Sequence, residues 1–181
     1  MNIFRLGCIH MGLVLVISGC RTETVEPAPA QKTVVEPVLA LVPFVQEDLW
    51  GYKTETGEVV IAPRYSMAAD FNAQGSAIVV DDKGWAIIDR RGAILVRPFI
   101  YDNGPDAFSD GLARFVEEGK MGYFAPSGKV VIAAQYDFAW PFENGVAEVC
   151  QDCARVADGE HFRIEGGTRW SIDKNGVKQA N

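Results

Sequence analysis

A motif that ends in glycine recurs four times along this chain, and this repetition constrains the fold more than any other feature. The copies begin at Trp50, Trp85, Met121 and Arg169, so successive copies are 35, 36 and 48 residues apart. In the first three copies an aliphatic run, a tyrosine, a phenylalanine and a Gly-x-Ala step follow in the same order. A repeat of this length predicts units that stack and bury their apolar faces against one another.

Turn signals divide each copy into three predicted strands. Each motif ends in a tetrad with the preferences of a type I turn and a bulged glycine, at residues 54–57, 89–92, 125–128 and 173–176. Residues 81–84 and 118–120 predict further tight turns. We therefore expect a motif strand, an aliphatic strand and a Gly-x-Ala strand that turns directly into the next motif strand.

No window of the sequence shows a long helical period, and glycine or proline interrupts the chain every few residues. The sequence therefore predicts an all-β fold, in which tandem repeats of about 35 residues form an antiparallel hairpin meander. Its closure as a curved sheet, a barrel or a propeller-like ring stays open. Aromatic residues at fixed repeat positions predict a shared core, with a sugar-binding aromatic platform as the alternative. These residues are Tyr65, Phe71, Tyr101, Phe108, Tyr136 and Phe142.

The pattern resembles the WG repeat family, also called the KWG repeat, of bacterial envelope proteins. The resemblance covers roughly residues 39 to 178. The first copy matches the family signature best, through Trp50-Gly51-Tyr52, whereas the second has Ala86 for the glycine and the third has Met121 for the tryptophan. The resemblance implies a β repeat architecture of three full copies and a truncated fourth, and it implies no particular ligand.

Residues 1–19 predict a signal peptide, because one positive charge precedes an apolar run that is too short to span a membrane. The run ends in Ile-Ser-Gly-Cys at residues 17–20, which resembles the lipobox of bacterial lipoproteins. The resemblance implies a lipid on Cys20 that anchors the protein in the cell envelope. Arg21 implies the outer membrane, with the protein facing the periplasm or the cell surface. An ordinary secretory signal with a chance cysteine is the alternative.

Two segments follow the signal peptide. Residues 20–38 are rich in Thr, Glu, Pro and Ala and contain no aromatic side chain, so we expect a disordered tether after the lipidated cysteine. Residues 39–181 form the predicted repeat domain. An insertion at about residues 150–167, with its own hairpin turn at residues 158–159, accounts for the longer spacing before the fourth copy.

Cys150 and Cys153 remain when Cys20 and the cysteine of the signal peptide are set aside. In an oxidising envelope each has the other as its partner, which predicts a disulfide. A redox CxxC motif would require a helix N-terminus that the sequence does not indicate. A zinc site would need His161 and Glu160 as further ligands. Both readings stay open as alternatives, and we expect no metal or other cofactor.

Charge and motifs limit the possible functions. The chain has 17 Lys and Arg against 24 Asp and Glu, and no basic run, which excludes nucleic acid as a partner. No nucleophile or phosphate-binding motif accompanies His161, the one histidine of the repeat domain. We therefore expect a non-enzymatic envelope lipoprotein that binds a protein or a glycan. The alternatives are a hydrolase that uses the loop carboxylates Asp70, Asp106 and Asp110, or a purely structural envelope protein.

Overall fold

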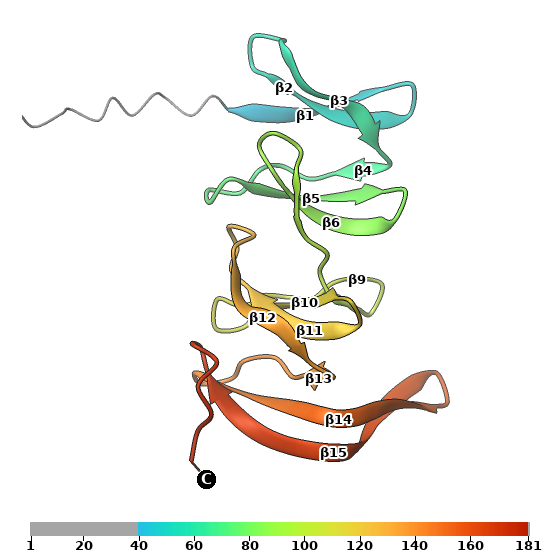
Figure 1. Ribbon diagram of the computed structural model, residues 1–181. Coiled ribbons are helices and arrows are strands. Elements are labelled where there is room, and N and C mark those ends of the chain that lie inside the picture. Colours follow the sequence, from blue (N-terminus) through green and yellow to red (C-terminus); the bar gives the residue numbers. More distant parts are fainter. Residues whose placement is uncertain (1–39, 181) are drawn as a thin grey trace, which may run out of the picture. The chain divides into compact units, whose positions relative to one another are not determined.

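The computed structural model describes residues 40–180, and all regular elements in this part of the chain are β-strands (Figure 1). The strands form separate open antiparallel sheets, and no sheet among these residues closes into a barrel. The predicted all-β fold is therefore confirmed, with its hairpins arranged in successive small sheets. The predicted signal peptide and the whole predicted tether, including Cys20, lie outside the described residues.

Four sheets follow one another along the chain, and each contains a motif strand. The first sheet consists of β1 (Leu41–Gln46), β2 (Leu49–Thr54) and β3 (Val59–Tyr65). The second consists of β4 (Met67–Ala68), β5 (Ser76–Asp81), β6 (Gly84–Asp89) and β7 (Ile94–Val96). The third consists of β10 (Ala113–Glu117), β11 (Lys120–Phe124) and β12 (Val130–Tyr136). The fourth consists of β13 (Phe138–Ala139), β14 (Val146–Asp158) and β15 (His161–Asp173). A separate small sheet pairs β8 (Ile100–Tyr101) with β9 (Gly104–Pro105).

Each sheet after the first combines parts of two sequence copies. The Gly-x-Ala strand β5 pairs with the next motif strand, β6, which in turn pairs with the aliphatic strand β7. The predicted order of strands is therefore confirmed. The boundary between two sheets, however, falls inside the sequence repeat, after the aliphatic strand and before the Gly-x-Ala strand. Every full copy thus contributes strands to two neighbouring sheets.

The four tetrads form the predicted turns. In the first copy the Gly57 amide donates to the Thr54 carbonyl at 2.9 Å, and the Thr54 amide donates to the Glu58 carbonyl at 2.8 Å. The same pair of bonds closes the other three turns. The four turn glycines have φ between 78° and 95°, a left-handed conformation that favours glycine. The type I turn with a bulged glycine is therefore confirmed, in the truncated fourth copy as well.

The glycine of the Trp-Gly motif is required by a close approach of two strands. A Cβ atom on Gly51 would meet the backbone carbonyl oxygen of Ile61, and one on Gly122 would meet that of Ile132. At these points β3 and β12 bulge, and their pairing with the motif strand shifts register. A side chain at either position would displace the neighbouring backbone, which explains the glycine of the motif.

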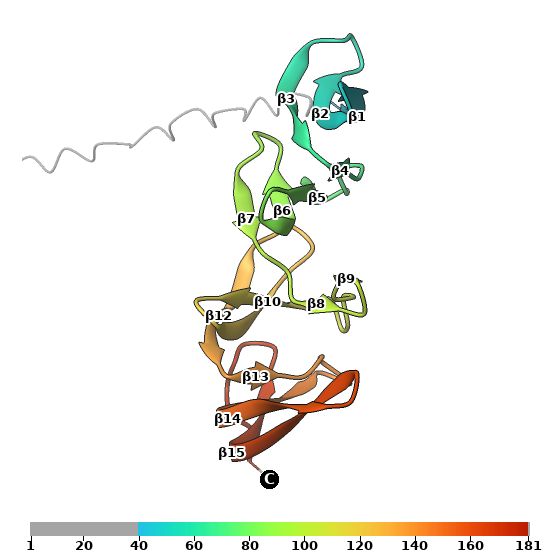
Figure 2. The same ribbon diagram turned by 90° about the vertical axis from the view of Figure 1, so that its right-hand side faces the viewer.

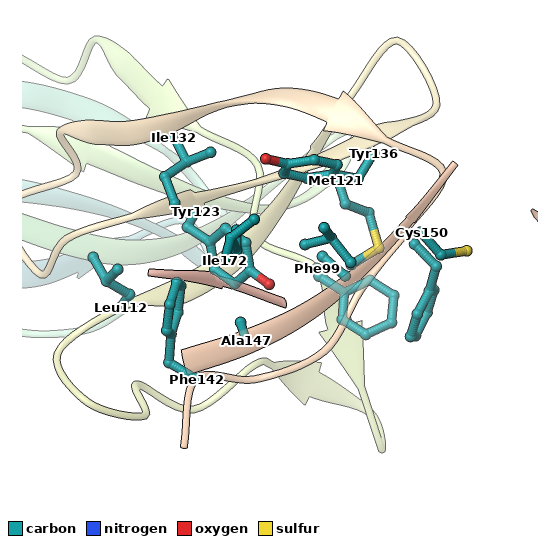
Figure 3. Close-up of a cluster of buried hydrophobic side chains, with 13 residues drawn as sticks. Phe99, Leu112, Met121, Tyr123, Ile132, Tyr136, Phe142, Ala147, Cys150 and Ile172 are labelled. Atoms are coloured by element: carbon teal, nitrogen blue, oxygen red, sulfur yellow. The ribbon is translucent and has the colours of Figure 1, made fainter. Parts of the chain in front are cut away.

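Three buried clusters lie between consecutive sheets. The first joins the first and second sheets around Tyr52 and Val79. The second joins the second and third sheets around Ile87 and Phe115. The third joins the third and fourth sheets around Tyr123 (Figure 3). Neighbouring repeats therefore cover one another's apolar faces, as the repeat pattern predicts, because a single hairpin cannot bury its own apolar face.

The aromatic repeat positions are core in two of the three full copies. The prediction is confirmed for the residues that are buried or packed against the core, which are Tyr65, Phe71, Tyr136 and Phe142. It is wrong for the second copy, where Tyr101 is 63% exposed and Phe108 is also exposed. Phe99, which is 4% exposed, occupies the core in this copy instead.

The second copy departs from the others because its aliphatic strand ends early. β7 ends at Val96, and the chain crosses to the third sheet, where Pro98 bridges to Phe115. At the position of Phe99, the first and third copies have the exposed polar residues Arg64 and Gln135. A continued strand would leave the Phe99 ring exposed, so burial of this ring favours the crossing.

The insertion lengthens the last hairpin and does not form a second hairpin. β14 continues from the Gly-x-Ala strand through the insertion, and the turn comprises Gly159 and Glu160, one residue later than expected. We call residues 151–168 the arm. Within it the Arg155 guanidinium lies 4.9 Å from the centroids of both the Phe99 and Phe162 rings. The arm therefore covers the aromatic core position that is peculiar to the second copy.

Candidate functional site

Six aliphatic side chains are exposed at equivalent positions of the three full copies. We call them the aliphatic row: Val59, Val60, Ile94, Leu95, Val130 and Val131. Their exposed fractions lie between 38% and 52%, whereas the next residue along each strand is buried. Exposed apolar side chains that gather on one surface of a soluble domain are typical of an interaction site.

The row arises from the place of the aliphatic strands in their sheets. β3, β7 and β12 are edge strands, and each begins with three consecutive aliphatic residues. In each strand the pairing with the motif strand shifts register between the first and the third residue, so the second is the extra residue of a β-bulge and its side chain is exposed. The first residue lies beside the turn, where little of the chain covers it. Both residues are therefore exposed in every copy.

Contacts between neighbouring repeats bring the aliphatic strand of each copy next to the turn of the following copy. The turn of the second copy lies against β3, because Arg64 Nη2 donates to the Gly92 carbonyl at 2.6 Å and a Cβ atom on Gly92 would meet the Ile61 side chain. The turn of the third copy lies against β7, because a Cβ atom on Gly128 would meet Leu95. The three aliphatic strands can be followed along one side of the repeat unit (Figure 2). The row therefore extends across three sheets.

Cations outnumber acids around the row. In the aliphatic strands and their turns, residues 54–65, 89–98, 125–136 and 173–178, the exposed cations are Arg64, Arg91, Lys129, Lys174 and Lys178. The exposed acids there are Glu55 and Glu58, both in the first copy. The chain as a whole has a net charge of −7. The surroundings of the row are thus positive in a protein that is otherwise acidic.

The turns at the opposite ends of the motif strands have the reverse charge. At residues 46–49, 81–84 and 117–120 the exposed acids are Glu47, Asp48, Asp82, Glu117 and Glu118, and the exposed cation is Lys83. Asp81, beside them, pairs with Arg97 at 2.6 Å, and the hydrogen bond from Arg97 lowers the pKa of its carboxyl group. The two sets of turns are therefore electrostatically distinct surfaces.

The predicted loop carboxylates have different surroundings. Asp106 is buried, and its two oxygens accept hydrogen bonds from Arg114 Nε at 2.6 Å and Arg114 Nη2 at 2.7 Å. Asp110 is exposed, and its Oδ2 atom accepts a hydrogen bond from the Gly145 amide at 2.6 Å. Asp70 is exposed in a loop after β4. The structure thus engages Asp106 and Asp110 in contacts within the fold.

The structure brings Cys150 and Cys153 together as a pair at disulfide distance, with their Cα atoms 6.2 Å apart. Both lie inside the long strand β14, where Asp152 between them has φ of 58°, so the pair bridges a kink in the strand and does not close its end. His161 and Glu160 lie at the tip of the arm. Among residues 40–180, no group of three or more His, Cys, Asp and Glu side chains is placed to hold a metal ion. The redox state of the pair in the cell stays a prediction.

Two hollows lie on the second sheet. An open one of about 600 Å³ is lined by residues 73–75 and 89–91. A smaller one of about 110 Å³ contains Asp70, Ser76 and Phe108 in its lining. The Ser76 hydroxyl donates to the Pro126 carbonyl at 2.6 Å, so it joins two repeats. Neither lining contains a histidine or a cysteine.

Sequence reasoning identified the aliphatic runs as strands but did not identify the row as a site. The available signal was the run of three aliphatic residues after each turn glycine, because a strand with one buried face requires only alternate apolar residues. Sequence reasoning also missed Arg114, which is 4% exposed. Its signal was an arginine directly after the Gly-x-Ala step of residues 111–113, because the first copy has the apolar Ile78 at the equivalent position.

The family model of the WG containing repeat matches this chain three times, at residues 50–85, 85–120 and 121–152. These matches cover more than half of the chain and begin at the same residues as the first three copies of the motif. No curated protein and no solved structure matches the chain. In the part of the chain that the structure describes, no helix has the length and apolarity that a membrane span requires.

Proposed function

Because this chain belongs to the WG containing repeat family, we propose that it is a non-enzymatic envelope lipoprotein whose repeat unit binds a partner through the aliphatic row. The row is the observation that carries the proposal, since it exposes aliphatic side chains at the same two positions of three copies. Exposure of this kind costs free energy in water, and a partner that covers the row recovers it. The partner is a protein or a glycan of the envelope.

The N-terminal sequence supports the membrane anchor of this proposal. Residues 17–20 resemble a lipobox, and a diacylglycerol on Cys20 would contribute about 0.8 kcal/mol for each buried CH₂ group. Residues 20–38, when extended, reach about 60 Å at roughly 3.3 Å per residue. The repeat unit could then reach partners within this distance of the membrane, while the lipid on Cys20 anchors the chain.

Site-specific photo-crosslinking in the producing cells tests the binding role. A benzoylphenylalanine at Leu95 or at Val131 should give a discrete adduct of higher mass. Val45 and Lys83 are matched control positions, because both are exposed and lie off the row. Equal adducts from the control positions, or none from the row in cells that contain the folded protein, would contradict the proposal.

Metabolic labelling with palmitate tests the anchor. The wild-type chain should incorporate the label and sediment with membranes, and the Cys20→Ser variant should do neither. A Cys8→Ser variant is the control, because this cysteine lies within the predicted signal peptide and leaves with it. Label on the Cys20→Ser variant would contradict the lipid anchor without affecting the role of the row.

A further inference from the structure

We infer that the partner of the aliphatic row is an extended polypeptide segment in which aliphatic side chains alternate with acidic ones. The inference rests on the proposed function and names the chemical class of the partner. Three features of the row support it: the chemistry of its six side chains, the charge around them, and its place on sheet edges.

The row side chains select for an apolar counterpart. All six are aliphatic hydrocarbons, and none has a hydrogen-bonding group. A sugar placed against them would bury hydroxyl groups without partners, which costs free energy. Valine, isoleucine or leucine side chains of a partner would instead remove apolar surface from water on both sides. The row therefore favours a polypeptide over a glycan.

The charge around the row selects for acidic residues. Lys129 directly precedes Val130, and Arg64 lies near the end of β3. Arg91 lies in the turn that precedes Ile94, where it is exposed and pairs with the partly buried Asp89 at 3.0 Å. Glu55 and Glu58 are confined to the first copy, so the second and third copies present cations next to their row residues. Opposite charge on a partner would speed its association and fix its orientation. The positive surface thus complements a segment rich in Asp or Glu.

The edge position selects for an extended backbone. β3, β7 and β12 each have a sheet neighbour on one side, so their other side presents backbone groups that a further strand can pair with. In an extended segment alternate side chains point the same way. A segment that alternates aliphatic and acidic residues would place aliphatic side chains on the row and acidic ones at its margin.

Fluorescence polarisation on the purified repeat unit within the full mature chain tests this inference. The probe is a fluorescein-labelled dodecapeptide of alternating valine and glutamate, and its matched control has lysine in place of every glutamate. We expect the glutamate probe to bind and the lysine probe to bind at least about tenfold more weakly. Binding of the glutamate probe should also weaken as salt is added.

Variants of the protein locate the binding. Leu95→Ser and Lys129→Glu should each weaken probe binding about tenfold. Val45→Ser and Lys83→Glu are matched controls that remove an exposed aliphatic side chain and reverse an exposed cation away from the row. They should leave the affinity unchanged. Circular dichroism confirms that all four variants are folded before they are compared.

Three results would overturn the inference. They are equal binding of both probes, equal loss of affinity in the control variants, and binding to phosphatidylglycerol vesicles in place of either probe. Failure of the probes together with row-specific adducts in cells would reject only the partner class and leave the proposed function intact. Absence of both probe binding and row adducts would reject the two together.

Discussion

The second repeat copy and its two neighbours show how far a repeat sequence determines its structure. β3 and β12 are seven-residue strands with the same burial pattern, whereas β7 of the second copy has three residues. The turn glycine and the tyrosine are eight residues apart in the first and third copies and nine apart in the second. In the copy that contains this extra residue, Tyr101 is exposed and Phe99 is buried.

This difference shows that the turns and the motif strands vary less between copies than the path from one sheet to the next. All four turns have the same hydrogen bonds, because these depend on four adjacent residues. The path from one sheet to the next depends on which aromatic ring is buried, and this varies between copies. In the second copy the buried Phe99 ring is held by Arg114, whose guanidinium lies 4.6 Å from the ring centroid and pairs with the buried Asp106.

Removal of Asp106 should have the largest effect on stability. Asp106→Ala would leave the Arg114 guanidinium buried without its carboxylate, which typically costs about 3–5 kcal/mol. Urea unfolding followed by circular dichroism measures the change. Asp110→Ala is the control, because this carboxylate is exposed. Similar unfolding of the two variants would show that the buried pair does not support the second copy.

Substitution of the motif glycine should have the next largest effect on stability, and this effect should differ between the copies. Gly122→Ala would place a Cβ atom against the Ile132 carbonyl, and such overpacking costs about 1–3 kcal/mol. The second copy already has Ala86, which is fully buried beside the short strand β7. Ala86→Gly should therefore not stabilise the protein, and it should cost about 0.5–1 kcal/mol. A stabilised Ala86→Gly variant would contradict this explanation of the motif.

The aromatic hydroxyl groups should show a smaller difference. The Tyr123 hydroxyl donates to the Trp140 carbonyl at 2.7 Å, and the Tyr52 hydroxyl donates to Ala69 in the same way. Tyr123→Phe should lower the free energy of unfolding by about 1 kcal/mol. Tyr101→Phe should leave it unchanged, because Tyr101 is exposed. Thermal unfolding of both variants measures the change. Equal losses of stability in the two variants would contradict the prediction and show that Tyr101 contributes to folding.

The sequence predicted the local features well and the long-range ones less well. The turns, the strand order and the pairing of the motif strand with its neighbours follow from adjacent residues and from alternation. The exposure of Tyr101, the buried Arg114 and the single long hairpin of the arm depend on contacts between copies, which one sequence does not reveal. Cys150 and Cys153 lie at disulfide distance, as the predicted pairing requires. Their place within β14 does not follow from the sequence, which predicts a new hairpin in the insertion.

The aliphatic row is an exposed feature that the second copy shares with its neighbours, and we propose that one partner covers all three copies. The direct test is photo-crosslinking from Val60 in cells that produce the Ile94→Ser/Val131→Ser variant. Both substituted residues are exposed, so the unfolding midpoint should stay close to that of the wild type. We predict that the adduct formed from Val60 is lost in this folded variant. An adduct of undiminished yield would contradict the claim that the three copies bind one partner along a single row.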